Sequence, residues 1–334
     1  MAENKKKPKL TTPLESIIES LFRFFDNKVY RYTALFAASG FLLILPSLSS
    51  RFTQEIMTNL FFYVVVCLGL NIIIGYAGLL HLGYAAFFAV GAYTTGIMSS
   101  RFGIDFWLTL PFSVVAAVLA GLAIGFPTLR LRGDYLAIVT LGFGEITRLT
   151  IRNLDITGGA VGLIGIQRPV FFGITLNQIS HFYYMFFILA ILAIFVSYRL
   201  HDSRMGRAWE YIREDEDAAA AMGINVTTSR LYAFIIGSSF GAVAGSFFAA
   251  KMTAISPDSF MFIHSVMFLM AVVLGGMGKI PGVVLGCIIV VLIPEISRDI
   301  GQYRLLIFAF MLLIIMLYRP QGIWPDRPTI SAKE

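Results

Sequence analysis

Residues 231–252 read LYAFIIGSSFGAVAGSFFAAKM. Apart from Lys251 near its end this stretch carries no charge, and about 20 predominantly apolar residues suffice for a helix to cross a bilayer. Gly237, Gly241 and Gly245 recur every fourth residue, so in a helix they share one face, where the missing side chains let another helix approach closely. We therefore predict a membrane-crossing helix whose glycine face packs on a neighbour. That neighbour is either a helix of the same chain or a second membrane subunit.

The rest of the chain has the same character. Of its 334 residues 57% are hydrophobic and only 14% are charged, against about 25% charged in soluble domains, and the mean hydropathy is +0.77. The fold class that we predict is an all-α membrane protein, a polytopic bundle of about ten transmembrane helices. Glycine and proline interrupt several of the spans, which indicates broken or tilted helices. The predicted spans are 33–50, 56–74, 80–100, 106–128, 134–148, 181–198, 231–252, 260–276, 281–297 and 304–318.

Both ends of the chain are predicted to be cytoplasmic. Residues 1–32 start with a basic tail and continue through Thr12-Pro13-Leu14-Glu15, a capping box with proline at the first helical position, into an amphipathic helix on the inner membrane face. With this end inside and ten spans, most of the 26 lysines and arginines fall on the cytoplasmic side, as the positive-inside rule requires. The membrane domain is then 33–318, and the loop 199–230 and the tail 319–334 are cytoplasmic.

One substantial polar segment, residues 199–230, interrupts the apolar sequence. It holds six of the chain's 20 acidic residues. Within it, Asp217 is followed by four alanines and then by Gly223, a pattern that predicts a short helix with an acidic start and a glycine stop. Such a helix is either a plain capped surface helix or the point at which a soluble partner supplies energy to the membrane domain.

The chain carries no motif for hydrolysing nucleotides by itself. The stretch 275–279, GGMGK, looks like a phosphate-binding loop, but Val273 stands where its first glycine belongs and Ile280 follows the lysine in place of serine or threonine, so we predict a tight turn. Cys67 and Cys287 fall within spans, and the four histidines lack metal-ligand spacing. No basic stripe with interleaved aromatics points to nucleic acid. We expect no catalytic residue, no metal and no cofactor, and therefore not an enzyme.

Ionisable side chains are scarce inside the predicted spans, which argues against ion coupling. Glu145 is the only acidic side chain well within one, and a charge in lipid costs about 2.5–3.5 kcal/mol or more. It should therefore face the bundle interior or a watery cavity as part of a transport path, or pair with Arg148 one turn away and serve the structure alone. Asn71 and Thr140 could share a cavity with Glu145, and Tyr76, Gly78 and His81 lie at the glycine-rich break after the second span. The predicted substrate path comprises Asn71, Tyr76, Gly78, His81, Thr140 and Glu145.

Several motifs, taken in order, resemble one family. From about residue 61 to 325 the chain is similar to the inner-membrane permease subunits of bacterial ABC importers for branched-chain amino acids, specifically the M-type member of the paired permeases. It departs from the family at Leu79 and His81, where polar residues are usual, and at Lys279, where threonine is usual. The motifs are GYAG at 75–78, LGYAAF at 82–87, LRLRGDYLAIVTLGFGEI at 129–146, TGG at 157–159, GL at 162–163, SRMGRA at 203–208, IRE at 212–214, GGMG at 275–278 and RPQG at 319–322.

The resemblance implies partners besides the lipid bilayer: a second permease subunit, two cytoplasmic ATP-binding subunits and an external substrate-binding protein. It also implies that the loop 199–230 couples the ATPases to the membrane domain. Similar permeases carry urea or short amides, so a different cargo stays open, as does a stand-alone secondary transporter or channel. A membrane-embedded enzyme would need a cluster of catalytic groups that the sequence lacks. The predicted coupling residues are Arg207, Trp209, Arg213, Glu214, Asp217, Ala218, Ala219 and Gly223.

Overall fold

The computed structural model describes residues 51–128, 133–171 and 173–296, together with residue 131 and single positions within 40–50 and 303–324. The predicted amphipathic helix within 1–32 lies outside the described residues, as do most of the tail 319–334 and most of the predicted spans 33–50 and 304–318. The described part from Arg51 onward forms one compact unit.

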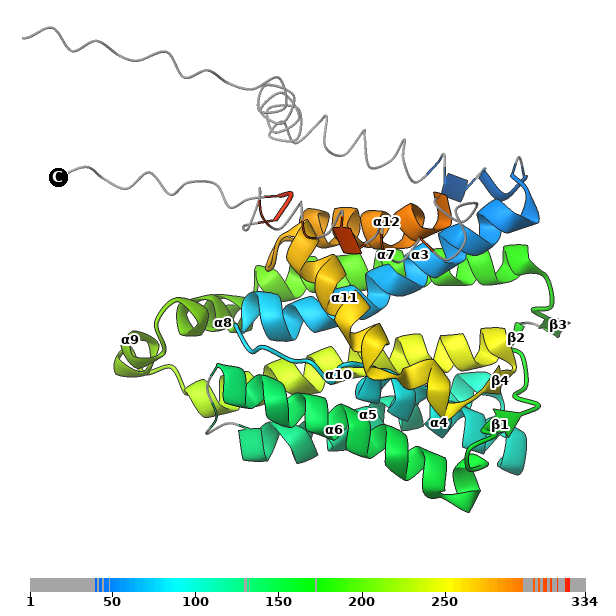
Figure 1. The fold of residues 1–334 in the computed structure, drawn as a ribbon, viewed down its shortest axis with the longest axis horizontal. Coiled ribbons are helices and arrows are strands. Elements are labelled where there is room, and N and C mark those ends of the chain that lie inside the picture. Colours follow the sequence, from blue (N-terminus) through cyan, green and yellow to red (C-terminus); the bar gives the residue numbers. More distant parts are fainter. Residues whose placement is uncertain are drawn as a thin grey trace, which may run out of the picture. The chain divides into compact units, whose positions relative to one another are not determined.

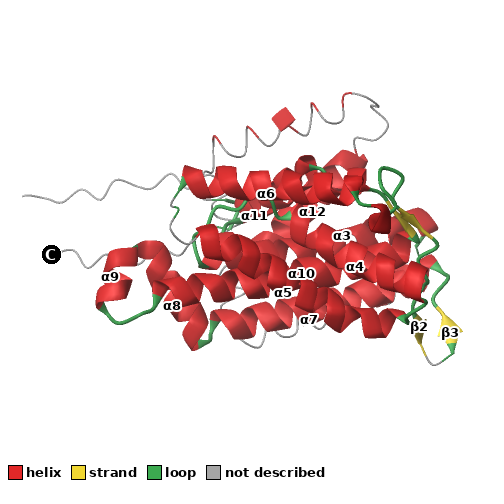
Figure 2. Ribbon diagram, turned by 90° about the horizontal axis from the view of Figure 1, so that it is seen from below, coloured by secondary structure: helices red, strands yellow, loops and turns green. Residues whose placement is uncertain are grey.

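Long helices dominate that unit (Figure 1). Two short polar helices, α8 and α9, lie at one end of it, and four two-residue strands lie at the other (Figures 1 and 2). The helices are α3 (Arg51–Asn71), α4 (Ala85–Phe102), α5 (Phe106–Thr128), α6 (Asp134–Asn153), α7 (Ile179–His201), α8 (Arg204–Glu214), α9 (Glu216–Ala221), α10 (Val226–Met252), α11 (Phe262–Gly275) and α12 (Ile280–Ile296), with the single turns η1 (Ile72–Tyr76), η2 (Asp155–Thr157) and η3 (Pro257–Phe260).

The expected count of about ten spans is wrong for the described part of the chain. Five stretches there are long and apolar enough to cross a membrane: Arg51–Tyr76, Phe106–Thr128, Ile179–His201, Val226–Met252 and Pro257–Gly275. The other predicted spans within it are helices of a different kind. The polar side chains of α4 include Thr95 and Ser99, α6 carries Glu145 and Arg148, and α12 has only 17 residues. Such helices need neighbours to cover their polar or short parts.

The helix α10 lies at the centre of the described bundle, against α3, α4 and α5. All three glycines predicted to form a packing face meet other helices of the same chain. A Cβ atom on Gly237 would lie 2.6 Å from Ile73 of η1, one on Gly241 3.1 Å from Phe87 of α4, and one on Gly245 would collide with the backbone of α4. Within the chain, this glycine face therefore serves packing, the first of the two alternatives.

The chain between α3 and α4 leaves the helical conformation inside the bundle. The last turn of α3 widens into the π-helical turn η1, and Gly78 then takes a φ of 68°. Residues 79–84 run back along the bundle without helical structure before α4 starts at Ala85. The predicted span 80–100 thus starts five residues too early. Irregular backbone at membrane depth occurs only where protein or a polar cavity covers it, and five of residues 77–84 are buried, whereas Gly78 is exposed.

The opposite end of the bundle is closed by short strands. The strand β1 (Leu163–Ile164) pairs antiparallel with β4 (Ala254–Ile255), with Leu163 opposite Ile255. The strands β2 (Val170–Phe171) and β3 (Ile174–Thr175) form a second small antiparallel pair. The contact between β1 and β4 joins the loop after α6 to the loop after α10, so the two halves of the chain are fastened together at this end.

Candidate functional site

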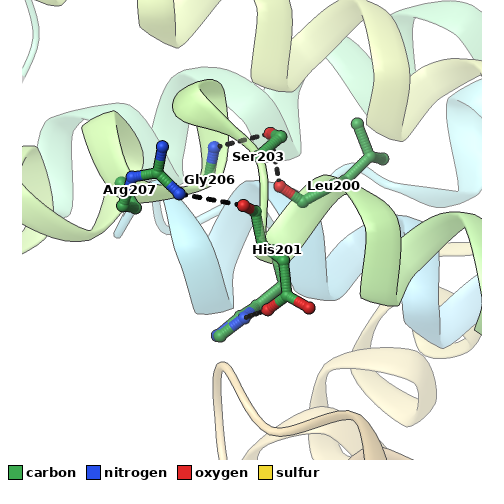
Figure 3. Close-up of polar contacts among 6 residues, drawn as sticks. Leu200, His201, Ser203, Gly206 and Arg207 are labelled. Carbon is green, nitrogen blue, oxygen red and sulfur yellow. Dashed lines mark hydrogen bonds and ion pairs between the residues drawn. The ribbon is translucent and has the colours of Figure 1, made fainter.

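The end of the bundle at α8 and α9 is built on a tight turn after α7 (Figure 3). The Ser203 Oγ accepts a hydrogen bond from the Gly206 N–H at 3.1 Å, which caps α8, and donates one to the carbonyl O of Leu200 at 2.6 Å. A Cβ atom on Gly206 would collide with the carbonyl oxygens of Leu200 and His201, so only glycine lets α8 start so close to α7. The Arg207 Nη1 donates to the carbonyl O of Asp202 at 2.9 Å.

The helix α8 is anchored to the membrane helices by buried aromatic side chains. Trp209 is fully buried, and its Nε1 donates to the carbonyl O of Ser229 at the base of α10 at 2.7 Å. Tyr76, at the end of η1, stacks on Trp209 with ring centroids 6.5 Å apart and planes 12° apart. Trp209 therefore cannot touch a soluble partner. Its place among the predicted coupling residues is that of an anchor between α8, η1 and α10.

The side chain of Arg213 is inserted among three glycines. Its Nη1 donates to the carbonyl O of Gly75 at 2.6 Å. A Cβ atom on Gly278 would lie 2.8 Å from the same nitrogen, and one on Gly78 would lie 3.0 Å from the Arg213 Cγ. Gly78 and Gly278 also have positive φ angles of 68° and 85°. The sequence motifs around residues 75–78, 212–214 and 275–278 thus meet at one point, which we call the glycine socket (Gly75, Gly78 and Gly278).

The predicted short helix exists as α9, with its start shifted by two residues. Asp215, and not Asp217, is the N-cap: its Oδ1 accepts from the N–H groups of Asp217 and Ala218 at 3.0 and 2.9 Å. Asp215 is the better cap because the helix already starts at Glu216, two residues after α8 ends. Gly223, with a φ of 84°, follows at the other end. The sequence shows both acids, but only the backbone conformation decides which one caps.

Only part of α9 faces outward. Ala219 is buried against the rest of the chain, whereas Ala218, Ala220 and Ala221 are exposed and Met222 is 78% exposed. An ion pair fixes this orientation. The Arg230 Nη1 and Nη2 donate to Glu216 Oε1 and Oε2 at 3.0 and 2.8 Å, and the two side chains are only 10% and 23% exposed. Ala219 is therefore a contact within the chain, and the outward surface of α9 lies one residue to either side of it.

Two polar side chains from the predicted path hold the irregular segment and its surroundings. The Asn71 Oδ1 accepts from the Gly278 N–H at 2.8 Å, which ties the end of α3 to the loop between α11 and α12. The Thr140 Oγ1 accepts from the Leu82 N–H at 3.0 Å. Farther along, the Ser265 Oγ of α11 accepts from the Ala85 N–H at 2.9 Å. Side-chain hydroxyl groups thus satisfy backbone N–H groups that a continuous helix would have paired by itself.

His81 lies at the middle of the irregular segment and is fully buried. Tyr84, Phe87 and Phe234 surround its ring, with centroids 5.3–6.1 Å away. Neither ring nitrogen has a hydrogen-bond partner among the described residues. A buried polar group left in this way costs about 1–3 kcal/mol. The packed position of this segment therefore carries a penalty that another position could remove.

Glu145 pairs with Arg148 on α6. The Arg148 Nε and Nη2 lie 2.9 and 2.8 Å from Glu145 Oε2, and Arg148 Nη1 is 4.0 Å from Asp258 Oδ1. The Glu145 side chain is 32% exposed, and Ile146 beside it is 65% exposed. The pair required by the structural alternative is thus present. It lies on a face of α6 that the described part of the chain leaves partly uncovered.

The predicted path residues thus fall into separate places. Tyr76 and Gly78 line the contact with α8, and Asn71 binds the loop after α11. His81 belongs to the irregular segment, which Thr140 of α6 binds, and Glu145 lies toward the outside of α6. Sequence reasoning missed Glu216, Arg230 and Ser265. Arg230 directly precedes an apolar run, where a basic residue is expected for topology alone, and this masked its pairing with Glu216.

These features define a class of protein. The described residues form a mostly helical bundle with spans that can cross a membrane, an irregular buried segment between α3 and α4, and a polar helical hairpin bound to that segment. Irregular backbone inside a membrane bundle is typical of transport proteins. The chain belongs to the family described as "Branched-chain amino acid transport system / permease component", whose model matches residues 52–317.

Individual relatives agree with this assignment. The chain is 41% identical to the high-affinity branched-chain amino acid transport system permease protein LivM of Escherichia coli K12, over 86% of this chain and 74% of the relative. It is 27% identical to the probable LivM permease of Methanocaldococcus jannaschii, over 80% and 92% of the two chains. It is also 25% identical to the permease protein LivH of E. coli K12, over 80% and 92%. No solved structure matches the chain.

Proposed function

We propose that this chain is a permease subunit of an ATP-driven importer for branched-chain amino acids in a bacterial inner membrane. The main structural support is the hairpin of α8 and α9, which is fixed to the membrane helices by Trp209 and Arg213. A soluble partner that moves this hairpin would therefore also move the membrane helices. The names of the related permeases support branched-chain amino acids as the cargo. The partners would be a second permease, as the similarity to both LivM and LivH suggests, two ATP-binding subunits and an external substrate-binding protein.

Uptake into proteoliposomes tests this function and its alternatives. The assembled complex, with binding protein outside and ATP inside, should accumulate radiolabelled leucine, isoleucine and valine. Unlabelled urea and acetamide should not compete. Competition by either would assign the related permease function for urea or short amides. Uptake by this chain alone, without ATP-binding subunits, would assign a stand-alone transporter or channel instead.

The same proposal sets the orientation of the described bundle. The end with α8 and α9 would be cytoplasmic, since it carries Arg199, Arg204, Arg207 and Arg213, and basic residues accumulate on that side. The end with the strands β1–β4 would then face the external binding protein. The chain termini are proposed to be cytoplasmic on the same ground.

We expect the outer surface of α9 to dock on an ATP-binding subunit, and Ala221→Arg tests this. Ala221 is exposed and lies in the last turn of α9, where a positive charge is favourable for the helix, so the substitution adds bulk without weakening α9. Uptake and co-purification of the ATP-binding subunits should both fall about tenfold or more. The matched control is Ala160→Arg, an exposed alanine at the opposite end, which should leave co-purification of the ATP-binding subunits unchanged. Normal co-purification with Ala221→Arg would remove α9 from the docking surface.

Glu145 is proposed to face the transport path, because a charged pair on a partly uncovered helix face would be costly in lipid. Glu145→Gln keeps the size of the side chain and removes its charge. Uptake should fall about tenfold while the complex still assembles and hydrolyses ATP at its resting rate. The comparison variant is Arg148→Gln, which breaks the same pair from the other side. If both variants lose assembly in step with uptake, the pair serves only to hold the bundle together.

A further inference from the structure

We propose that Arg213 is a latch that holds the irregular segment 77–84 in its packed position, and that withdrawing this side chain from the glycine socket lets the segment move and brings His81 into contact with water. Arg213 would then be a positioning residue, acting through the backbone of Gly75 and Gly78. The latch rests on the geometry of this chain alone. Only the identity of the partner that pulls it depends on the proposed function.

Arg213 lies close to all three glycines of the socket, although Arg213 and Gly78 are themselves exposed. Its guanidinium donates to the Gly75 carbonyl at 2.6 Å, and its stem lies so near Gly78 that a Cβ atom there would be 3.0 Å from Cγ and 3.4 Å from Cβ of Arg213. The Gly75 carbonyl belongs to η1, where π-helical geometry leaves backbone groups in need of other partners. An arginine donor from another helix thus stabilises the last turn before the segment.

Beyond the socket the segment is held by few bonds. The Leu79 N–H donates to the Ile73 carbonyl at 3.0 Å, and the Tyr84 Oη donates to the Gly237 carbonyl of α10 at 2.7 Å. The other ties are the single hydroxyl groups of Thr140 and Ser265. Single hydrogen bonds to side chains contribute far less than a continuous helix or strand ladder. Gly83 packs closely against the backbone of Thr140 in α6, so this end of the segment is fixed. The end nearest to α8 has sparser ties and opens locally at lower cost, and Arg213 holds that end.

The buried His81 side chain destabilises the packed position of the segment. Its imidazole is fully buried among aromatic rings, without a hydrogen-bond partner among the described residues. Water would satisfy both ring nitrogens as soon as the segment shifts. The packed position therefore needs an external contact to stabilise it, and the Arg213 side chain is such a contact, three residues away at Gly78.

Motion at α9 would reach the latch directly. Only Asp215 separates α8 from α9, and Arg213 lies in the last turn of α8. A partner that tilts α9 must therefore displace Arg213, whereas Trp209, one turn earlier, stays anchored to Ser229. The hairpin would thus rotate about the anchored Trp209, and this rotation would move Arg213 out of the glycine socket.

Alkylation of a thiol at position 81 tests the latch in the full-length chain in membrane vesicles. N-ethylmaleimide needs a hydrated thiolate, so its reaction rate at His81→Cys reports whether water reaches this position. The substitution also removes the unpaired imidazole, so the test isolates the hold of Arg213 on the segment. Adding Arg213→Ala should raise that rate about tenfold or more. The native thiols of Cys67 and Cys287, both buried, serve as internal controls and should stay unreactive in the same sample. Mass spectrometry separates the three sites.

Each outcome decides the matter. A rise at position 81 alone supports the latch, and Arg213→Lys, which keeps one donor without the guanidinium fork, should then give an intermediate rate. A parallel rise at Cys67 and Cys287 would show that Arg213 only stabilises the fold, and an unchanged rate at position 81 would show that it holds nothing closed. Both results overturn the proposal.

A second arm separates the latch from the proposed function. In the assembled complex with native Arg213, ATP turnover should also accelerate labelling at position 81. If Arg213→Ala opens the segment but ATP does not, the latch stands and the proposed drive by ATP-binding subunits fails.

Discussion

A Gly245→Ala permease is expected to fold but to unfold at a much lower temperature than the native chain. Gly245 of α10 meets Phe88 and Ala92 of α4, and an added Cβ atom would collide with the Phe88 carbonyl O and lie 2.9 Å from the Ala92 N. These are backbone atoms of a helix and cannot swing aside, so α4 and α10 would have to separate along their length. Overpacking of this kind costs about 3 kcal/mol, the upper end of its usual range. Thermal unfolding of the purified protein, followed by size-exclusion chromatography, measures the loss.

The matched control for this substitution is Gly142→Ala in α6. No atom lies within 4 Å of a Cβ built on Gly142, and alanine favours a helix over glycine by about 1 kcal/mol. The isolated chain with Gly142→Ala should therefore be as stable as the native chain or slightly more so. Equal stability of the Gly245 and Gly142 variants would contradict the close approach of α4 to α10.

Breaking the ion pair between Glu216 of α9 and Arg230 of α10 should strongly destabilise the contact between these two helices. Glu216→Gln leaves the guanidinium of Arg230, only 10% exposed, without its carboxylate, and removing one partner of a buried pair costs about 3–5 kcal/mol. We expect α9 to detach from the base of α10, uptake to fall to background, and limited proteolysis within 214–226 to accelerate more than tenfold. The membrane helices keep their own packing, so the variant should still insert into membranes.

Two control variants separate the effect of an unpaired buried charge from other effects of the substitution. The double variant Glu216→Met with Arg230→Met removes both charges and should recover most of the protease resistance, because no unpaired charge remains buried. Glu210→Gln, at an exposed position of α8, changes the net charge by the same amount and should behave like the native chain. Rapid proteolysis in the double variant as well would mean that hydrogen bonding by this pair, and not the penalty of a lone charge, holds α9 in place.

The sequence predicted the fold best where apolar composition or glycine spacing determines the structure. The long apolar runs predicted helices correctly, and the repeating glycines of α10 predicted a packing face, because glycine spacing alone sets how closely helices approach. The glycines after the second span indicated a break. Its extent was not readable, since the hydroxyl groups that satisfy it, from Thr140 and Ser265, come from residues far along the chain.

The candidate site was predicted less completely, for related reasons. The polar loop and its short helix were visible, but two acids compete for the cap, and the alanine run looks alike on every side. Only tertiary packing turns Ala219 inward and leaves Ala221 outward. The prediction of about ten spans failed in the described residues because hydropathy was read over stretches such as α4 and α6 as though lipid surrounded them, whereas Thr95 and Thr140 are buried against other helices.

The backbone contact between α4 and α10 restricts the routes that a solute can take. Where Gly91 faces Ala242 and Gly245 faces Phe88, main chain touches main chain, so no side-chain rotation can open a passage between these helices. Any conformational cycle must carry α4 and α10 together as one rigid body. Rearrangement is left to elements fastened by side chains, and a solute must pass along some other face of this pair.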